Sequence, residues 1–233
     1  TRHDTHASLA IRALHAGKHV FVEKPLALNE AELRSVASAA RDSGRLLMVG
    51  FNRRFAPPVL EVKKLFLPEQ PKAIMIRVNA GILPAEHWVN DPLIGGGRII
   101  GEACHFIDLA TYLAGSRIVS VCASSMTDAS NLNNNVVINM SMSNGSVASI
   151  NYYSNGNKKL NKEYIEVFCG GSVAVIDDFR TLTVQGGKDK KINYRQDKGH
   201  AACVQAFLRS IKEGTACPIP FEESYFSMLA TFK

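Results

Sequence analysis

The segment HVFVEKPLALNE, residues 19–30, decides the fold. Its apolar run at residues 20–22 is typical of a short strand that is buried on both faces of a parallel sheet. Glu23, Lys24 and Pro25 end this run with two opposite charges and a proline, which predicts a loop at the carboxyl end of the strand. Because ligands of open parallel sheets bind at the carboxyl ends of strands, the sequence places Lys24 where a ligand would lie.

Helical periodicity flanks this strand on both sides. Residues 5–16 repeat apolar side chains at helical spacing, and Gly17 follows them, the residue type that commonly ends a helix. Residues 29–43 show the same pattern and are closed by Gly44, and residues 46–49 are a second apolar strand. The order helix, strand, helix, strand predicts a parallel sheet with right-handed crossovers.

Two such units make only half of a doubly wound domain. The dinucleotide-binding turn G-x-G-x-x-G follows a strand and opens a helix, and the glycines at 95–97 and 170–171 have neither that spacing nor that context. We therefore expect residues 1–52 to be the second half of a Rossmann-like dinucleotide-binding domain whose first half, with its phosphate-binding loop, is absent. Since the sequence starts at Thr1 without Met, we expect a part of a longer protein.

From residue 53 onward, strands joined by tight turns dominate. They are expected at residues 72–80, 117–126, 134–142, 146–154, 162–168, 172–177, 181–185 and 190–194. Helices are expected at residues 57–66, 97–114, 199–213 and from 222 onward. The fold class is thus α/β plus α+β. Residues 53–233 are expected to form a substrate-binding and oligomerisation domain with a large, mostly antiparallel, open-faced sheet, packed on one side by helices 98–114 and 199–213.

Composition excludes several classes of protein. The 233 residues are 46% hydrophobic and carry a formal charge of +6 without a run of like charges, so a nucleic-acid partner is not expected. No apolar run approaches the length of a membrane span. The five cysteines form no C-x-x-C pair, which favours a reducing cytoplasm over a disulfide framework. Apolar residues on both faces of strand 134–142 predict an oligomer.

Lys24 is the first candidate for chemistry. An ammonium group at the end of a buried strand can hydrogen-bond a substrate oxygen or carry a proton. Glu23 could pair with it, and the Lys24–Pro25 bond, an X-Pro bond at a tight site, could be cis. The alternative is a surface lysine that caps the strand end.

The stretch GEACHFIDL, residues 101–109, is the second candidate. On a helix, Glu102, His105 and Asp108 are spaced by three residues and share one face, so the carboxylates could orient the imidazole as a general base. The alternatives are a half-buried histidine with two acidic neighbours or a zinc site. No third and fourth ligand is evident, so no metal is predicted.

Three further groups of residues are candidates for binding. Arg53 and Arg54 suit a phosphate or a carboxylate, or else salt bridges between domains. Trp88, the only tryptophan, either walls a sugar-sized pocket or belongs to the core. His3 and His6 flank the start of the first helix, where His6 is either a local cap or a cofactor contact.

These motifs together resemble one family. TRHDTHA (1–7), EKPLAL (23–28), VGFNRRFAP (49–57) and GGGRIIGEACHFIDL (95–109) resemble, in this order, the Gfo/Idh/MocA family of glucose-fructose oxidoreductases and inositol dehydrogenases. The resemblance continues more loosely to the C-terminal strands. It implies an oxidoreductase that transfers a hydride between NAD or NADP and a secondary alcohol or ketone of a sugar, cyclitol or nucleotide-sugar-like substrate. It also implies a homodimer or homotetramer formed through the open-faced sheet.

The resemblance also implies roles for individual residues. Lys24 matches the lysine that contacts substrate and nicotinamide, and His105 matches the histidine that takes the proton of the substrate hydroxyl. The positions implied near the cofactor are Thr1, His6, Glu23, Pro25 and Asn52. The positions implied near the substrate are Arg53, Trp88, Glu102 and Asp108.

Two features depart from the family pattern. The family often has an aspartate four residues before the histidine, and this chain has Gly101 there. The absent phosphate loop implies that the chain binds NAD(P) poorly and is inactive on its own. The segment GGGRIIGEACHF (95–106) resembles a branch of the family in which this domain forms the C-terminal part of a longer, two-domain oxidoreductase. The alternative function is a catalytically silent member that acts as a ligand-binding or oligomerisation domain.

Overall fold

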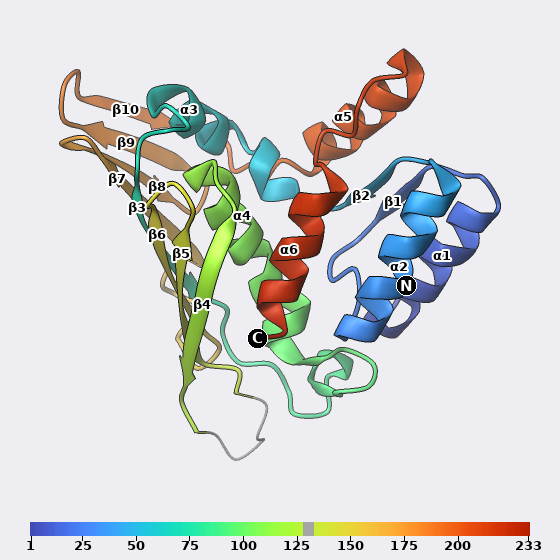
Figure 1. Ribbon diagram of the computed structural model, residues 1–233. Helices are drawn as coiled ribbons and strands as arrows, with labels where there is room; N and C mark the ends of the chain where they lie inside the picture. The colour runs from blue at the N-terminus through green and yellow to red at the C-terminus, as the bar shows by residue number, and fades with distance from the viewer. Residues whose placement is uncertain (128–132) are drawn as a thin grey trace. The chain divides into compact units, whose positions relative to one another are not determined.

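The computed structural model describes residues 1–127 and 133–233 (Figure 1). The chain divides into two compact units, and each is built from separate stretches of sequence. Unit 1 comprises Thr1–Phe51, Glu86–Asp108 and Ala201–Lys233, whereas unit 2 comprises Asn52–Ala85 and Leu109–His200. The chain first leaves unit 1 after Phe51 and returns to it twice, which the sequence pattern does not reveal.

Unit 1 contains a short parallel sheet and four helices. Strand β1 (Val20–Val22) pairs in parallel with β2 (Leu47–Val49). The helices are α1 (His6–His15), α2 (Glu30–Ser43), most of α5 (His200–Glu213) and α6 (Phe221–Thr231). Helices α1 and α2 pack on each other, and α6 contacts both α2 and β2. The predicted helix–strand–helix–strand order of the first 50 residues is confirmed.

Helix α2 shows how local sequence sets these elements. The Asn29 side chain accepts a hydrogen bond from the Glu32 amide at 2.9 Å, and the Glu32 carboxylate accepts one from the Leu28 amide at 2.9 Å. This reciprocal cap satisfies two backbone donors at the helix start. Gly44 ends the helix with φ of 60°, a left-handed conformation that suits glycine. Leu33 on this helix is fully buried.

Unit 2 is organised around an eight-stranded sheet (Figure 1). In chain order its strands are β3 (Ala73–Asn79), β4 (Ile118–Ser125), β5 (Val136–Met142), β6 (Val147–Tyr153), β7 (Glu163–Cys169), β8 (Ser172–Asp177), β9 (Thr181–Gln185) and β10 (Lys190–Asn193). Their order across the sheet is β10-β9-β8-β7-β3-β6-β5-β4. Only β3 and β6 pair in parallel, which confirms the prediction of a large, mostly antiparallel sheet.

The two faces of this sheet differ. Val136, Ile138 and Met140 of β5 are buried on the face that carries helix α3 (Pro57–Leu65) and the C-terminal half of α4 (Cys104–Ala114) (Figure 1). On the opposite face, Val147 and Phe168 are about half exposed. The sheet is therefore open-faced, as predicted.

One prediction about the helices is wrong. Helix α5 was expected to cover the large sheet, but it belongs to unit 1, where Phe207 packs on Phe21 of β1 with ring centroids 5.8 Å apart. The helix predicted from residue 97 to 114 is confirmed, but Ile99–Ala103 within it forms a π-helical turn before α4 begins at Cys104. Such turns often occur at functional sites.

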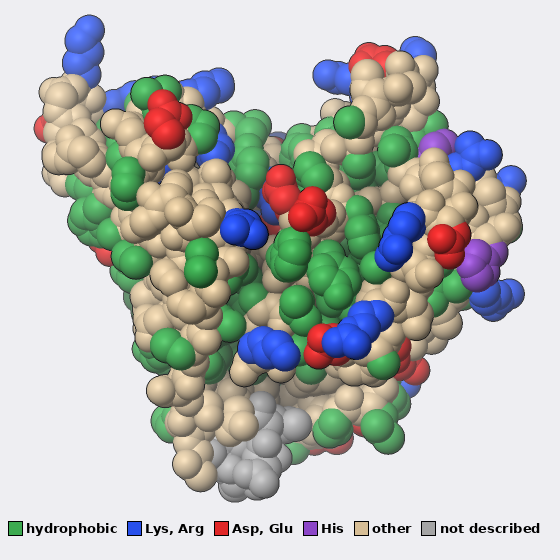
Figure 2. Space-filling model, viewed as in Figure 1, with side chains coloured by type: hydrophobic (Ala, Val, Ile, Leu, Met, Phe, Trp, Pro, Cys, Tyr) green, Lys and Arg blue, Asp and Glu red, His purple; other side chains and the backbone are tan. Residues whose placement is uncertain are grey.

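The surface carries both signs of charge. On the face shown in Figure 2, Lys and Arg side chains are interspersed with Asp and Glu rather than gathered in one basic stripe. No helix in the described part of the chain combines the length and apolarity that crossing a membrane requires.

Candidate active site

Lys24 lies in the loop that follows β1, as the sequence predicts. The Lys24–Pro25 peptide bond is cis. The Lys24 Nζ donates a hydrogen bond to the carbonyl oxygen of Gly101 at 2.8 Å. Glu23 does not pair with this ammonium group; its carboxylate lies against Gly50, where an added Cβ would be 3.1 Å from Glu23 Oε2. The lysine is thus held against the turn that leads into α4.

His105 lies in the first turn of α4, four residues after Gly101. It is 6% exposed, and its ring packs edge-on against Phe51 with centroids 5.9 Å apart. Burial raises the pKa of the neighbouring Cys104 thiol to about 12, and the charge of Lys24 opposes this rise. The Lys24 ammonium group is therefore close enough to act electrostatically on the turn that carries His105.

Two further histidines surround the Lys24–Pro25 bond. His6 Nδ1 hydrogen-bonds the carbonyl oxygen of Pro25, and His3 Nδ1 hydrogen-bonds the carbonyl oxygen of Gly95, both at 2.8 Å. A carbonyl oxygen only accepts, so Nδ1 carries the proton in both rings. In the neutral form, Nε2 of each ring is then an acceptor. The contact to Pro25 places His6 beside the predicted cofactor loop.

His3 is held in its neutral form. Burial lowers the pKa of His3, and although the hydrogen bond to Gly95 and the charge of Glu102 raise it, Lys24 and His6 lower it further. A histidine whose pKa lies below its ordinary value is mostly neutral at pH 7.

Trp88 opens the short helix η3 (Trp88–Asn90) and is partly exposed. Its ring meets the ring of His3 in a T-shaped contact with centroids 4.7 Å apart. The ring centroids of His3 and His6 are 5.6 Å apart. The structure therefore brings Trp88 together with His3 and His6. The sequence pattern places His3 beside the first helix but indicates no role for it. The one sequence feature that points to His3 is the glycine at position 101, against which its ring packs.

The two acidic residues near His105 lie in different surroundings. Glu102 belongs to the π-helical turn and pairs with Arg98 at 3.7 Å, whereas Asp108 is 1% exposed within α4. A π turn holds more residues than an α turn, so the three-residue spacing that placed Glu102 above His105 does not apply across this boundary. Within residues 1–127 and 133–233, no group of three His, Cys, Asp or Glu side chains is arranged to hold a metal ion.

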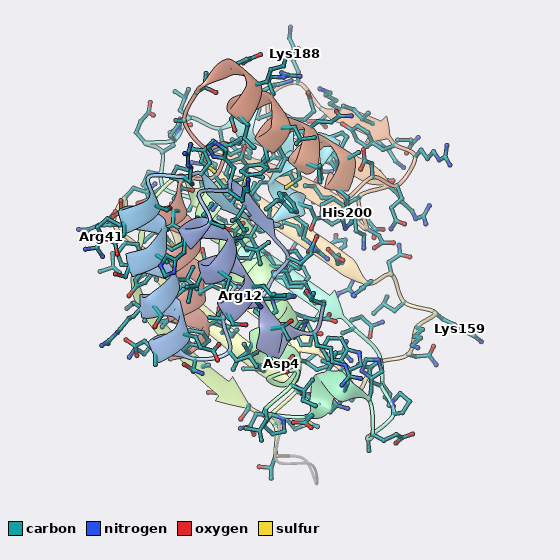
Figure 3. All side chains as sticks on the ribbon, turned by 90° about the vertical axis from the view of Figure 1, so that its right-hand side faces the viewer. Asp4, Arg12, Arg41, Lys159, Lys188 and His200 are labelled. Atoms are coloured by element: carbon teal, nitrogen blue, oxygen red, sulfur yellow. The ribbon has the colours of Figure 1, made fainter. Side chains whose placement is uncertain are left out.

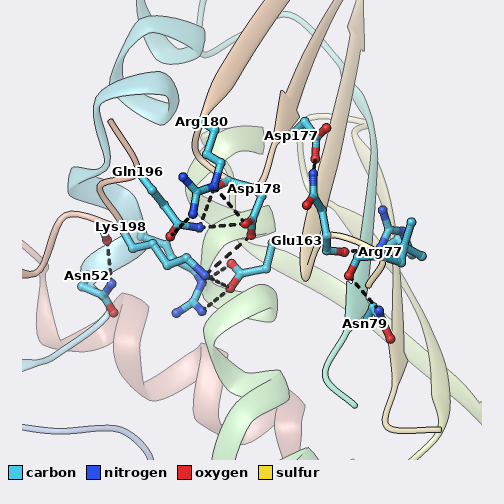
Figure 4. A network of polar contacts seen from close by, with 12 residues as sticks. Asn52, Arg77, Asn79, Glu163, Asp177, Asp178, Arg180, Gln196 and Lys198 are labelled. Carbon is cyan, nitrogen blue, oxygen red and sulfur yellow. Dashed lines mark hydrogen bonds and ion pairs between the residues drawn. The ribbon is translucent and has the colours of Figure 1, made fainter. Parts of the chain in front are cut away.

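Asn52 and Arg53 belong to unit 2, where they take part in a buried ionic network (Figure 4). Arg53 Nε and Nη2 donate to the two carboxylate oxygens of Glu163 at 2.7 and 2.8 Å, and Lys198 Nζ donates to Glu163 Oε1 at 2.7 Å. Asn52 Nδ2 donates to the Lys198 carbonyl oxygen at 2.6 Å. Two N–H groups of Arg53 are thus committed to Glu163, and its contact with substrate stays a prediction.

The neighbouring Arg54 has an aromatic partner, since its guanidinium lies 5.1 Å from the centre of the Tyr112 ring. Thr1 is exposed at the start of the chain. Its role near a cofactor stays a prediction, as does that of Glu23.

Comparison with known proteins assigns the family. Residues 1–51 match the model of an oxidoreductase family with an NAD-binding Rossmann fold, GFO_IDH_MocA, and residues 70–171 match the model of the GFO/IDH/MocA C-terminal domain. The chain belongs to the GFO/IDH/MocA family. The resemblance inferred from the motifs is confirmed.

Relatives in the GFO/IDH/MocA family include dehydrogenases of cyclitols. Inositol 2-dehydrogenase 2 of Saccharopolyspora erythraea is 38% identical over 125 residues, which cover 52% of this chain and 35% of that protein. Myo-inositol 2-dehydrogenase of Thermotoga maritima is 25% identical over 247 residues, which cover 97% of this chain and 72% of that protein. The chain thus matches only about a third of the length of the first relative.

A solved structure shows the same fold. Levoglucosan dehydrogenase in complex with NADH and levoglucosan superposes with a TM-score of 0.85 at 22% identity, over 99% of this chain and 74% of that chain. At this identity the likeness supports the GFO/IDH/MocA fold.

Proposed function

We propose that this chain forms the substrate side of an NAD(P)-dependent dehydrogenase that interconverts a secondary alcohol and a ketone on a sugar, cyclitol or nucleotide-sugar-like ring. One observation carries the proposal. Lys24 Nζ is held by the carbonyl oxygen of Gly101, one helical turn before His105. This hydrogen bond holds the Lys24 ammonium group at the π-helical turn that precedes His105, and a hydrogen-bond donor and an imidazole are the two groups that acid–base chemistry on a hydroxyl group requires.

The Lys24 ammonium group has capacity for a ligand. Among the residues that the structure describes, Gly101 is its one hydrogen-bond partner, and an ammonium group has three N–H donors. Because Lys24 is partly buried, its remaining donors favour an oxygen of a bound substrate or of the nicotinamide group. We propose that the positions implied near the cofactor by the family resemblance contribute to the nicotinamide end of the site: Thr1, His6, Glu23, Pro25 and Asn52.

The proposed reaction divides its work between two side chains. Lys24 donates a hydrogen bond to the substrate oxygen and stabilises the negative charge that develops on it. His105 removes the proton of this hydroxyl group and becomes an imidazolium as the alcohol is oxidised to the ketone. NAD(P) supplies the hydride acceptor when it is bound. Partly exposed Trp88 offers a flat apolar surface of the kind that sugar rings contact.

The relatives support a ring alcohol as the substrate class. They include dehydrogenases of inositol and of levoglucosan, and one solved structure of this fold is a UDP-N-acetylglucosamine 3-dehydrogenase from Acidithiobacillus ferrooxidans. Each of these compounds carries a secondary alcohol on a six-membered ring. The rival function is a silent, ligand-binding member, which Gly101 favours because that position lacks a carboxylate to assist His105.

The test uses this chain extended at its N-terminus to the length of its relatives. NAD⁺ or NADP⁺ is mixed with myo-inositol, levoglucosan or UDP-N-acetylglucosamine, and the absorbance of the reduced cofactor is followed. We expect turnover of at least one ring alcohol, and a loss of about 100-fold or more in Lys24→Ala and in His105→Ala. Arg12→Ala, an exposed residue of α1 (Figure 3), is the control and retains activity. Binding of NAD(P)H without turnover of any sugar supports the silent member instead.

A further inference from the structure

Gly101 is a point of close approach in the candidate site. A Cβ atom added at this residue would lie 2.9 Å from His3 Cε1 and 3.2 Å from His3 Nδ1, whereas its distance to the Gly95 carbonyl oxygen would be 3.4 Å. Contacts below 3.0 Å between such atoms require that something shifts. The imidazole of His3 therefore occupies the space beside Gly101 that a side chain would need.

The turn that carries His3 is tied to the loop before α4. His3 Nδ1 donates to the Gly95 carbonyl oxygen at 2.8 Å, and the Asp4 amide donates to the Ile94 carbonyl oxygen at 3.1 Å; Figure 3 labels Asp4 at this turn. Gly95 itself is close to Trp88, since a Cβ at Gly95 would be 2.6 Å from the Trp88 carbonyl oxygen. His3, 8% exposed, is thus wedged between the Trp88 ring and the Gly101 backbone.

Lys24 depends on the same backbone. Its ammonium group is held by the carbonyl oxygen of Gly101, and the His3 ring packs on the Cα side of that residue. A shift of the His3 ring therefore allows Gly101 to move, and with it the hydrogen bond that fixes Lys24. No catalytic contact of His3 is needed for this effect.

We propose that His3 is a positioning residue of the active site, which sets the Gly101 carbonyl and through it the Lys24 ammonium group. We call His3 and Gly101 an interlocked pair. The His3 ring leaves no room for a side chain at residue 101, and the same ring limits how far the Gly101 backbone can move. The expected effect of His3 on the reaction rate rests on the proposed function. The packing of His3 against Gly101 does not, and it can be measured without a substrate.

The first test is a double-mutant cycle read by the fluorescence of Trp88, the only tryptophan. Gly101→Ala adds a methyl group against the His3 ring, so it is expected to displace the ring and change the Trp88 emission. In a His3→Ala background the methyl group meets no ring, and Gly101→Ala is expected to leave the emission unchanged. Residues in contact couple in this way, whereas independent sites add. Equal effects of Gly101→Ala in both backgrounds would overturn the interlock.

The second test is kinetic and uses the N-terminally extended protein. His3→Ala is expected to lower kcat about tenfold to a hundredfold through misplacement of Lys24, with little change in KM for the cofactor. Gly101→Ala is expected to lower kcat in the wild-type background and to have no further effect in His3→Ala. His3→Asn retains an N–H donor for the Gly95 carbonyl oxygen and is expected to recover most of the lost rate.

The outcomes separate the two proposals. If no sugar is turned over but the fluorescence cycle shows coupling, the proposed function fails while the interlock stands. If turnover is observed and His3→Ala keeps the wild-type kcat, the positioning role of His3 is overturned. Circular dichroism of each variant confirms that it is folded, and His3→Val, which also lacks the ring and its N–H donor, serves in place of His3→Ala if the latter unfolds.

Discussion

Glu163→Gln tests the ionic network that holds the linker after β2 to the large sheet. Glu163 is fully buried on β7, and although burial raises its pKa, Arg53 and Lys198 lower it from 4.5 to about 2. At about 1.4 kcal/mol per pKa unit, this difference corresponds to about 3 kcal/mol of stability at pH 7. The substitution removes the charge and leaves the buried Arg53 and the partly buried Lys198 around a neutral amide, so we expect the free energy of unfolding to fall by about 3 kcal/mol or more.

The direction of the Glu163 pKa shift determines how this stabilisation varies with pH. Because the folded pKa lies below the unfolded value, the stabilisation is fully present above about pH 5 and is lost as the pH falls toward 2. The difference between wild type and Glu163→Gln is therefore expected to shrink from about 3 kcal/mol at pH 7 to about 1.4 kcal/mol at pH 3.

The assay is urea unfolding followed by circular dichroism at both pH values. Glu166→Gln is the matched control, since Glu166 lies on the same strand, is partly exposed and forms no ion pair among the described residues. It is expected to change the free energy of unfolding by no more than about 0.5 kcal/mol. A loss below about 1 kcal/mol for Glu163→Gln, or a loss that stays the same at pH 3, would refute the reasoning.

Three further predictions concern other parts of the chain. Because the rings of His3 and His87 both lie against Trp88, the pH dependence of its fluorescence is measured in a His87→Gln background. There it is expected to follow the pKa of His3, below 6.5, and to disappear in His3→Asn; a midpoint above 6.5 contradicts the burial of His3. Iodoacetamide at pH 8 is expected to label the exposed Cys122 and to spare Cys104, because burial of the Cys104 thiol raises its pKa to about 12. Labelling of Cys104 as fast as Cys122 in the folded protein would contradict this. If a homo-oligomer forms through the open face of the sheet, Phe168→Asp on this face is expected to lower the mass measured by analytical ultracentrifugation. The control Lys188→Asp, in the turn before β10, is expected to leave the mass unchanged. An unchanged mass for Phe168→Asp argues against an interface on this face.

Elements with a strong local pattern were predictable from the sequence. The strands of the large sheet lie within one or two residues of their predicted positions, because alternation and glycine turns are local signals. The cap of α2 was readable for the same reason, from Asn29 at its start and Gly44 at its end. Lys24 was placed correctly at a strand end, since its position follows from the apolar run before it.

Relations over long sequence distances were not predictable. An amphipathic helix shows that one face is buried but not what buries it, so α5 was assigned to the large sheet instead of β1. Arg53 could be seen as a candidate anion ligand, but its partner Glu163 lies 110 residues away. The contact of His3 with Gly101 is equally remote, and a π-helical turn in place of an α-helical one leaves no clear mark in GRIIGEAC.

The most direct test of the central claim is hydride transfer itself. A ring alcohol deuterated at its carbinol carbon is incubated with NAD⁺ and the N-terminally extended protein, and the reduced nicotinamide is analysed for deuterium. We predict deuterium at C4 of the nicotinamide with the wild type, and a rate about 100-fold lower in Lys24→Ala and His105→Ala while both variants still bind NADH. Transfer at the wild-type rate in either variant would contradict the account.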